Sequence, residues 1–307
     1  MYRVNVSSIQ DFMQCRFRWW CKWVMNRTPL NEMPALGAGK LLHLIFENAF
    51  NGKDISQSAT IWCSEYRRII DTLHPLAQAG QLKALQTVED LTEALPLWCD
   101  TFPYDEVLEV EEPFEWEHNG ILWRGRPDRT VLVGKNRIWH TQNRGLAPSM
   151  NFGTYTRLMK RHYHEHLYGE YLQQKYRKVL KRPKLKFGGT VANLVRKLKY
   201  RTNVGKKNEA TKTAAEMFWQ GAVSIEIDSP LHMAVMMAME QHVRDMQYVE
   251  HRWRDHNEVP APNEKMNGGF SGSSEDPYYK VLIGEIGLDD DNVFKAREDT
   301  YAVQETE

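Results

Sequence analysis

The chain has 307 residues, and its 42% hydrophobic and 26% charged residues exclude a disordered tail, a fibre and a small disulfide-rich scaffold. No stretch approaches the roughly 18 uncharged apolar residues of a membrane span, and MYRVNVSSIQDFMQC lacks the apolar core of a signal peptide. We therefore expect a cytoplasmic protein without a membrane partner, whose four cysteines are reduced.

The 40 basic and 40 acidic residues cancel in total but are segregated along the sequence. Residues 157–212 carry 17 Lys or Arg against 3 acids, whereas residues 89–117 carry 11 acids and no Lys or Arg. Residues 250–307 carry 14 acids against 6 bases. The basic segment also contains several tyrosines, which favours contact with a nucleic acid over the alternative of a solvated helix face.

The predicted elements begin with helices. Residues 7–25 start with the N-capping pair Ser7-Ser8 and continue in an apolar-rich helical pattern. A second helix is expected over residues 39–50, and residues 59–99 are largely helical in pattern.

The pattern then changes to strands. Residues 107–117 alternate, residues 121–133 form a second strand-like run, and residues 137–142 form a third. The turn signals His-Asn-Gly and Gly-Lys-Asn separate the three runs. This order predicts an antiparallel three-stranded meander.

Helical patterns dominate the remainder. Residues 155–182 are expected to be helical, residues 185–195 can add a strand, and the Met-rich residues 231–249 form a core helix. Residues 257–277 have a loop composition. The order indicates an α/β fold leaning towards α+β. We expect one domain over 1–307, divided into a helical flank (1–100), a sheet and site core (101–200), a helical part (201–255) and a loop-rich acidic tail (256–307).

Five polar residues form a candidate metal site, with Glu47 in a supporting position. His43 and Glu47 lie four residues apart on one helix face. Glu111, Asp128 and Gln142 follow in order along the meander. Carboxylates together with an imidazole and an amide oxygen can bind Mg²⁺ or Mn²⁺.

The order and flanks of these residues resemble the PD-(D/E)XK nuclease superfamily, with most similarity to the RecB-type exonuclease branch that includes CRISPR-adaptation nucleases and many phage proteins. The matching segments, which extend over about residues 5–180, are VSSIQDFMQCRFRWW, Gly39-KLL-His43-LIF-Glu47, EVEEPFEW, Gly125-Arg-Pro-Asp128 and His164-EHL-Tyr168. In EVEEPFEW the family's acidic position is best matched by Glu111, with Glu112 as the alternative.

This resemblance implies a central mixed sheet flanked by helices, with helical N-terminal and C-terminal flanks. It implies a Mg²⁺- or Mn²⁺-dependent deoxyribonuclease that hydrolyses phosphodiester bonds, acting on DNA ends or single strands. His43, Glu111, Asp128 and Gln142 would hold the metal, and Glu111, Asp128, Gln142 and Arg144 would form the catalytic set. Glu47, His164 and Tyr168 would support the site or position DNA. If the chain is of phage origin, the host cytoplasm is its compartment.

Two departures from the family pattern leave a second function open. Gln142 stands at an acidic position, and Arg144 stands at the position of a lysine. Glutamine removes a negative charge, and arginine does not release a proton because its pKa exceeds about 12. The alternative is therefore a catalytically degenerate pseudo-nuclease that acts as a DNA-binding or assembly subunit.

Neither iron nor zinc is expected. Many RecB-type relatives hold a [4Fe–4S] cluster with one N-terminal and three C-terminal cysteines, but no cysteine follows Cys99, so Cys15 would lack its partners. His162, Glu165 and His166 match the zinc motif H-x-x-E-H. This short pattern in a His-rich stretch has no third ligand, and we favour a role beside a phosphate backbone.

The basic segment is expected to contact the DNA backbone, with aromatic residues available to stack on unpaired bases. The candidate DNA-binding residues are Lys160, Arg161, Lys175, Arg177, Lys178, Lys181, Arg182, Arg196, Lys197 and Lys199.

Overall fold

The computed structural model describes residues 2–30, 34–146, 151–196, 213–262 and 276–297, and all structural statements below concern these residues. The chain forms two compact units, and it crosses from one to the other four times. Unit 1 comprises residues 1–31, 113–126 and 234–307, and unit 2 comprises residues 32–112 and 127–233.

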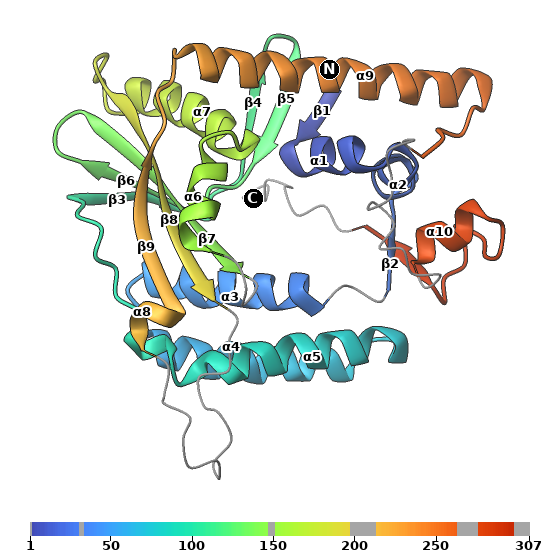
Figure 1. The fold of residues 1–307 in the computed structure, drawn as a ribbon, viewed down its shortest axis with the longest axis horizontal. Helices are drawn as coiled ribbons and strands as arrows, with labels where there is room; N and C mark the ends of the chain where they lie inside the picture. The colour runs from blue at the N-terminus through green and yellow to red at the C-terminus, as the bar shows by residue number, and fades with distance from the viewer. Residues whose placement is uncertain (1, 31–33, 147–150, 197–212, 263–275, 298–307) are drawn as a thin grey trace, which may run out of the picture. The chain divides into compact units, whose positions relative to one another are not determined.

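Unit 2 is built around a five-stranded mixed sheet in the order β3-β6-β7-β8-β9 (Figure 1). Only β7 and β8 pair in parallel; the other neighbours are antiparallel. The strands are β3 (Glu106–Val110), β6 (Arg129–Val133), β7 (Arg137–Leu146), β8 (Lys186–Arg196) and β9 (Phe218–Ser224).

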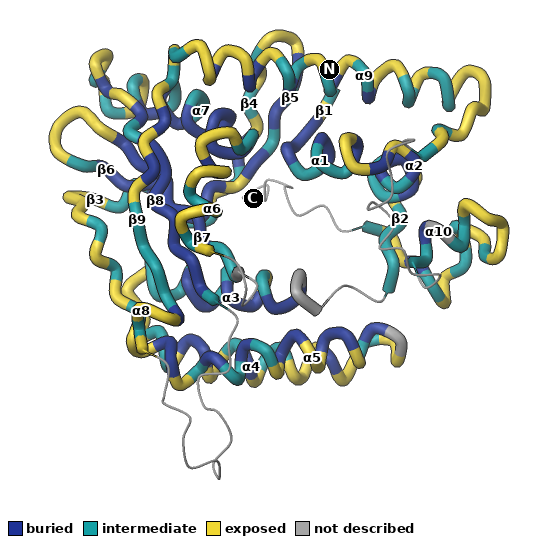
Figure 2. The backbone as a smooth tube through the Cα atoms, in the orientation of Figure 1, coloured by how far each residue is buried: buried dark blue, intermediate teal, exposed yellow. Residues whose placement is uncertain are grey.

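Helices accompany this sheet in unit 2. They are α3 (Pro34–Phe50), α4 (Ile55–Asp71), α5 (Pro75–Thr92), α6 (Phe152–Met159), α7 (Tyr163–Val179) and the short α8 (Ala214–Met217), with a 3₁₀ turn at Leu95–Leu97. Helices α3, α4 and α5 share one apolar core, which also includes Val195 of β8 and Met217 of α8. Figure 2 shows β7 and β8 buried over most of their length, whereas α4 and α5 keep an exposed face. The mixed sheet flanked by helices confirms the expected fold class.

Unit 1 contains a three-stranded sheet in the order β1-β5-β4 and a two-stranded sheet of β2 and β10. The strands are β1 (Tyr2–Asn5), β2 (Arg27–Pro29), β4 (Phe114–His118), β5 (Ile121–Gly125) and β10 (Phe294–Ala296). The helices are α1 (Val6–Gln14), α2 (Arg16–Trp19), a π-helical turn η1 (Trp20–Val24), α10 (Pro277–Leu282) and α9 (Pro230–His256), which begins in unit 2.

The expected three-stranded meander is wrong in its connections. The first two predicted strands each break in the middle, so that residues 107–117 form β3 and β4, and residues 121–133 form β5 and β6. The hairpin β4–β5 belongs to one sheet and β3–β6 to another. Pro113 and Pro127 lie at the two breaks, where a proline cannot donate to a ladder and restricts the preceding residue.

Smaller differences follow from tertiary context. Residues 218–224, in the range expected to be helical, form the edge strand β9 instead. The helix expected over residues 155–182 is divided into α6 and α7. Strands β1, β2 and β10 were not predicted, because runs of three or four residues carry too little periodicity to be recognised.

Candidate metal centre

Three of the predicted site residues lie in one row across adjacent strands. In the β3–β6 ladder Val110 pairs with Arg129, so the next step places Glu111 opposite Asp128. The Glu111 amide confirms this by donating to the Asp128 carbonyl oxygen at 3.0 Å. In the β6–β7 ladder Arg129 pairs with Thr141, so the same antiparallel register, continued by one residue, places Asp128 opposite Gln142. Directly opposed residues share a face of the sheet.

Helix α3 adds His43 to this row. The His43 Nδ1 atom lies 3.4 Å from Glu111 Oε1 and 3.5 Å from Asp128 Oδ2. One possible ligand atom from each of the three residues falls within 4.8 Å of the other two. Within the described residues these three form the one group of histidine, cysteine and acidic side chains that can hold a metal ion.

The two strand breaks position the carboxylates. Glu111 follows the end of β3 and has a positive φ of 50°, a conformation that is uncommon for a residue other than glycine, asparagine or aspartate. Strained backbone of this kind is concentrated at functional sites. Asp128 precedes β6, and the Asn143 amide donates to its Oδ2 at 2.6 Å. The backbone of the sheet therefore fixes the Asp128 carboxylate directly and the position of Glu111 through its main chain.

The charge of the site acts on His43. Burial alone would lower the pKa of His43, but attraction to Asp128 and Glu111 outweighs burial and raises it. A proton on Nδ1 and a metal ion would compete for the same electron pair, because a histidine ligand must be neutral. The carboxylates of Glu111 and Asp128 thus favour either a proton on His43 or a bound metal ion.

Gln142 offers a free acceptor beside this cluster. Its side chain is 2% exposed, and its Oε1 atom has no hydrogen-bond partner within the part of the chain that the structure describes. A buried oxygen without a donor is costly unless a water or an ion satisfies it. The donor set of one imidazole, two carboxylates and one amide oxygen therefore fits a hard divalent cation.

Arg144 follows two residues after Gln142 on β7 and is held among polar groups. Burial opposes its charge, but attraction to Tyr155, Asp128 and Glu165 outweighs burial and raises the pKa of Arg144. Tyr155 of α6 also forms a side-chain hydrogen bond with Arg144. The guanidinium group is thus close enough to the cluster to lower the pKa of His43 slightly.

Helix α7 supplies a buried polar layer beside Arg144. Glu165 is fully buried, accepts a hydrogen bond from Thr190 Oγ1 and lies 3.4 Å from His140 Nδ1. The rings of His140 and His164 both contact Tyr168 edge to face, at centroid distances of 5.3 and 5.7 Å. Burial, followed by the charge of Arg144, lowers the pKa of His164 to about 3.

The structure also locates the residues that were predicted to support the site and the alternative ligand Glu112. His164 and Tyr168 are buried in unit 2, and both are close enough to Arg144 to interact with it electrostatically. Glu47, one turn after His43 on α3, is half-buried and does not belong to the metal-binding group. Glu112, the alternative to Glu111, has a side chain that is 59% exposed and lies 3.6 Å from the Lys175 ammonium. Their functional roles stay predictions.

The basic candidates differ in their surroundings. Lys160, Arg161, Lys178 and Lys181 are exposed, and Arg177, Arg182 and Arg196 are half-buried. Lys175 instead donates to the buried Glu109, which also accepts from Tyr176 at 2.8 Å, so its charge is compensated inside the protein. Lys197 and Lys199 lie outside the described residues.

The H-x-x-E-H residues have other partners. His166 Nε2 bonds to the Lys160 carbonyl at 2.9 Å, and its Nδ1 lies 3.1 Å from Nδ1 of His232. Glu165 is engaged by Thr190, as described above. In the described chain these residues do not form a metal-binding group.

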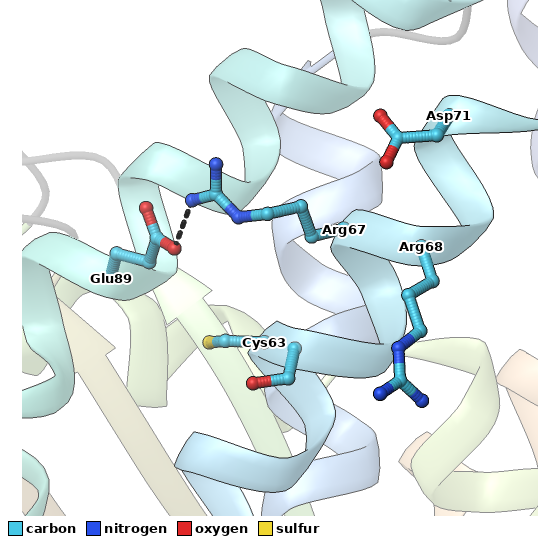
Figure 3. Close-up of a pocket in the computed structure, with 6 residues that line it drawn as sticks. Cys63, Arg67, Arg68, Asp71 and Glu89 are labelled. Atoms are coloured by element: carbon cyan, nitrogen blue, oxygen red, sulfur yellow. Dashed lines mark hydrogen bonds and ion pairs between the residues drawn. The ribbon is translucent and has the colours of Figure 1, made fainter.

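A hollow of about 260 Å³ between α4 and α5 contains none of the candidate site residues (Figure 3). Arg67 Nη2 crosses it to bond Glu89 at 2.6 Å. Burial raises the pKa of the Cys63 thiol to about 11, which leaves it protonated and a poor nucleophile at neutral pH. We assign no chemistry to this hollow.

Sequence reasoning missed Tyr155, His140 and Glu165. Glu165 was considered only within the zinc motif, and Tyr155 only as the start of a helical pattern. Strand alternation places His140, Gln142 and Arg144 on one face of β7, and this signal could have associated His140 with the site.

The described helices include none that is long and apolar enough to cross a membrane. No family model matches the sequence, and no curated protein matches it. Among solved structures, the chain is similar to a crystal structure from Eubacterium rectale described as a "Putative exonuclease". That likeness covers 93% of this chain and 94% of the other, with 13% identity and a TM-score of 0.47. We draw no inference from a similarity at this level.

Proposed function

We propose that the protein is a metal-dependent deoxyribonuclease of the PD-(D/E)XK type that acts on DNA ends or single strands. The observation that carries the proposal is the convergence of His43, Glu111 and Asp128 at the two strand breaks. All three are among the four positions that the order of sequence motifs selects as ligands. Two carboxylates and an imidazole that offer ligand atoms within 4.8 Å of one another form a site that favours a cation.

Each residue has a defined task in this proposal. His43, Glu111, Asp128 and the Gln142 oxygen would hold Mg²⁺ or Mn²⁺. When bound, the metal polarises the phosphodiester and lowers the pKa of a coordinated water. Arg144 would donate to the scissile phosphate, since guanidinium groups match phosphate oxygens in pairs. Tyr155 would keep Arg144 in place.

A pseudo-nuclease is the second candidate, and specific contacts favour it. Arg144 is attracted to Asp128 and Glu165 and bonded to Tyr155, so its guanidinium group is already engaged inside the protein. Gln142 also contributes no charge to the site. Under this alternative the polar cluster stabilises the fold, and the protein acts as a DNA-binding or assembly subunit.

The deciding experiment is a cleavage assay on linear and circular DNA, single- and double-stranded, with Mg²⁺, Mn²⁺ or EDTA. The test variant is Asp128→Asn, which keeps the shape and an acceptor for the Asn143 amide. The control is Glu112→Gln, an exposed carboxylate one residue from the ligand Glu111. We expect metal-dependent cleavage by the wild type and the control and none by Asp128→Asn. A wild type that is inactive on all four substrates supports the pseudo-nuclease.

A further inference from the structure

Unit 1 contains a cavity of about 360 Å³ that is separate from the groups of the metal centre. Its walls come from β1, α1, α2, η1, β5 and α9, together with Arg297 after β10. The volume is within the range of small-molecule binding sites, which is roughly 300–1,000 Å³. No residue of the cavity has a role in the function proposed above.

Among the charged side chains of the walls, cationic groups outnumber acidic ones. Arg3, Arg124 and Arg297 line the cavity, against one carboxylate, that of Glu250. Glu250 already accepts from the Tyr2 hydroxyl at 2.9 Å and from Arg254, which does not line the cavity, at 2.6 Å. The cavity is therefore suited to a ligand that is anionic and rich in acceptors.

Two of the three cationic groups are held by neighbouring side chains. Arg124 Nε lies 3.0 Å from Glu115 Oε1 across the β4–β5 ladder. The Arg297 guanidinium carbon lies 4.0 Å from the centre of the Trp23 ring, and Trp23 is fixed in turn by donating to Asp11 at 2.7 Å. Ordered donors lose little conformational entropy when a ligand binds.

Trp19 gives an independent indication of a ligand. Its side chain is 1% exposed and is fixed edge to face against Phe12 at 5.1 Å, and it lines the same cavity. Its indole N–H, which can only donate, has no acceptor within the described part of the chain. A buried donor normally has a partner, and an acceptor atom of a bound ligand would supply one.

We propose that this cavity binds a nucleotide, with its phosphate among the three guanidinium groups and its nucleoside part in the space beside Trp19 and Trp23. Arginine recognises phosphate with paired hydrogen bonds, and aromatic rings are the usual neighbours of a base. The inference rests on the proposed function for the choice of a nucleotide among anions. The nucleotide is either a free product of hydrolysis or the terminal residue of a strand.

Binding is tested in EDTA on the Asp128→Asn background, so that the metal centre does not contribute. Calorimetry would compare dTMP, thymidine and inorganic phosphate. The test variant is Arg3→Gln with Arg297→Gln. The matched control, with the same change in charge, is Arg244→Gln with Arg252→Gln, two arginines of α9 that do not line the cavity. Trp19→Phe removes the unpartnered donor and keeps an aromatic ring.

We expect dTMP to bind at least about tenfold more tightly than thymidine or phosphate alone, since only dTMP offers both the charged phosphate and the nucleoside; tenfold corresponds to about 1.4 kcal/mol. The test pair should lose about tenfold in dTMP affinity, Trp19→Phe should lose less, and the control pair should bind as the parent does. Absent dTMP binding, equal binding of thymidine, or equal losses in the test and control pairs would overturn the inference. Thermal melts of both pairs check that each is folded.

Competition then identifies the source of the nucleotide. Displacement of dTMP by a 5′- or 3′-phosphorylated oligonucleotide, but not by its unphosphorylated form, assigns the cavity to a strand end. Failure of both to compete assigns it to the free nucleotide. Metal-dependent DNA cleavage by the wild type without dTMP binding would remove this inference and leave the proposed function. Binding of dTMP by a wild type that does not cleave DNA would leave this inference and remove the proposed function.

Discussion

A backbone hydrogen bond connects Glu111 to Asp128, whereas the negative charges of their side chains repel each other. The Glu111 amide donates to the Asp128 carbonyl at 3.0 Å, while both carboxylates lie within 3.5 Å of His43 Nδ1. The hydrogen bond fixes two negative groups at neighbouring positions in a partly buried site. Their repulsion is relieved by a cation, and the folded state should therefore bind one more tightly than the unfolded chain does.

The first prediction is that Mg²⁺ or Mn²⁺ stabilises the fold through these carboxylates. A ligand present at 100 times its dissociation constant adds about 2.7 kcal/mol to the free energy of unfolding, which for a protein of this size is a rise of a few degrees in Tm. Thermal melts in metal and in EDTA measure the rise. We expect it in the wild type and in Glu112→Gln, and its loss in Asp128→Asn. An equal rise in all three proteins would mean that the metal binds elsewhere.

The second prediction concerns Tyr155, which sequence reasoning did not select. Tyr155→Phe removes the hydroxyl that bonds Arg144 and keeps the ring. If Arg144 holds the scissile phosphate, its misplacement should lower kcat by about tenfold, which corresponds to about 1.4 kcal/mol of transition-state stabilisation. KM for DNA and the melting temperature should change little.

The matched control for Tyr155 is Tyr104→Phe, which also removes one hydroxyl in unit 2 and retains the ring contact with Arg129. It should leave kcat unchanged. A fall in Tm without a fall in kcat would show that the Tyr155–Arg144 bond serves the fold and not the reaction.

Much of the architecture could be predicted because it depends on long periodic segments. Helices α3 and α7 correspond to patterns of more than ten residues, and the first six residues of strand β7 correspond to a shorter predicted run. The breaks within the first two strands could not be found this way, because residues on both sides of Pro113 and Pro127 have strand-like patterns. A proline lowers the expectation of a continuous strand but does not say that the two halves join different sheets.

The candidate site could likewise be predicted only in part. His43, Glu111 and Asp128 were selected from motif order, and the structure brings them together. The engagement of Lys175 by Glu109 was hidden, because the two residues are 66 positions apart and a charge run looks the same whether or not one member is buried. The buried layer of His140, Glu165 and Thr190 likewise depends on contacts between β7, α7 and β8 that no local pattern encodes.

The third prediction is a loss of stability in acid caused by His164. Its pKa is about 3 in the folded protein, well below the ordinary value near 6.5 that applies when the chain is unfolded. Between these values the unfolded chain binds a proton that the folded protein does not. Stability should therefore fall as pH falls from about 6.5 to about 3, by up to about 1.4 kcal/mol per pH unit for this group.

The check is urea unfolding at several pH values for His164→Gln and for His251→Gln, an exposed histidine of α9. His164→Gln should flatten the pH dependence, and His251→Gln should retain the contribution of His164. Burial also lowers the pKa of His162 and His166, so a residual slope of the same sign should remain. Identical slopes in the two variants would contradict the assignment.

The fourth prediction is that DNA affinity depends steeply on salt through exposed basic residues near the end of α7. Lys178→Gln with Lys181→Gln removes two exposed charges. Each lost phosphate contact lowers the slope of log affinity against log salt by about 0.7 for a single strand or 0.9 for a duplex. Fluorescence anisotropy should show this reduction, and it should show none for Lys53→Gln with Lys83→Gln, two exposed lysines elsewhere in unit 2. A flat salt dependence in the wild type would remove the case for a nucleic-acid partner.

The last prediction separates the two candidate functions by altering the two departures from the family pattern. Gln142→Glu would replace a neutral oxygen, which has no hydrogen-bond partner among the described residues, with a charged ligand, and this should tighten metal binding. Arg144→Lys would introduce an ammonium group that can lose a proton if burial lowers its pKa. In a working site the double variant should raise metal-dependent cleavage by about tenfold or more, if each change contributes about 1 kcal/mol.

The contacts of Arg144 determine how the single variants should differ. Gln142→Glu alone adds a third carboxylate beside Glu111 and Asp128 while Arg144 remains, so its gain should appear mainly as a lower metal requirement. Arg144→Lys alone gives up the planar group that bonds Tyr155 and should gain less, or lose activity. In a pseudo-nuclease neither single variant nor the pair should cleave DNA, because two side chains do not restore a misaligned site. Cleavage by the wild type that disappears in Asp128→Asn would exclude the pseudo-nuclease, since a cluster that serves only the fold has no reaction to lose.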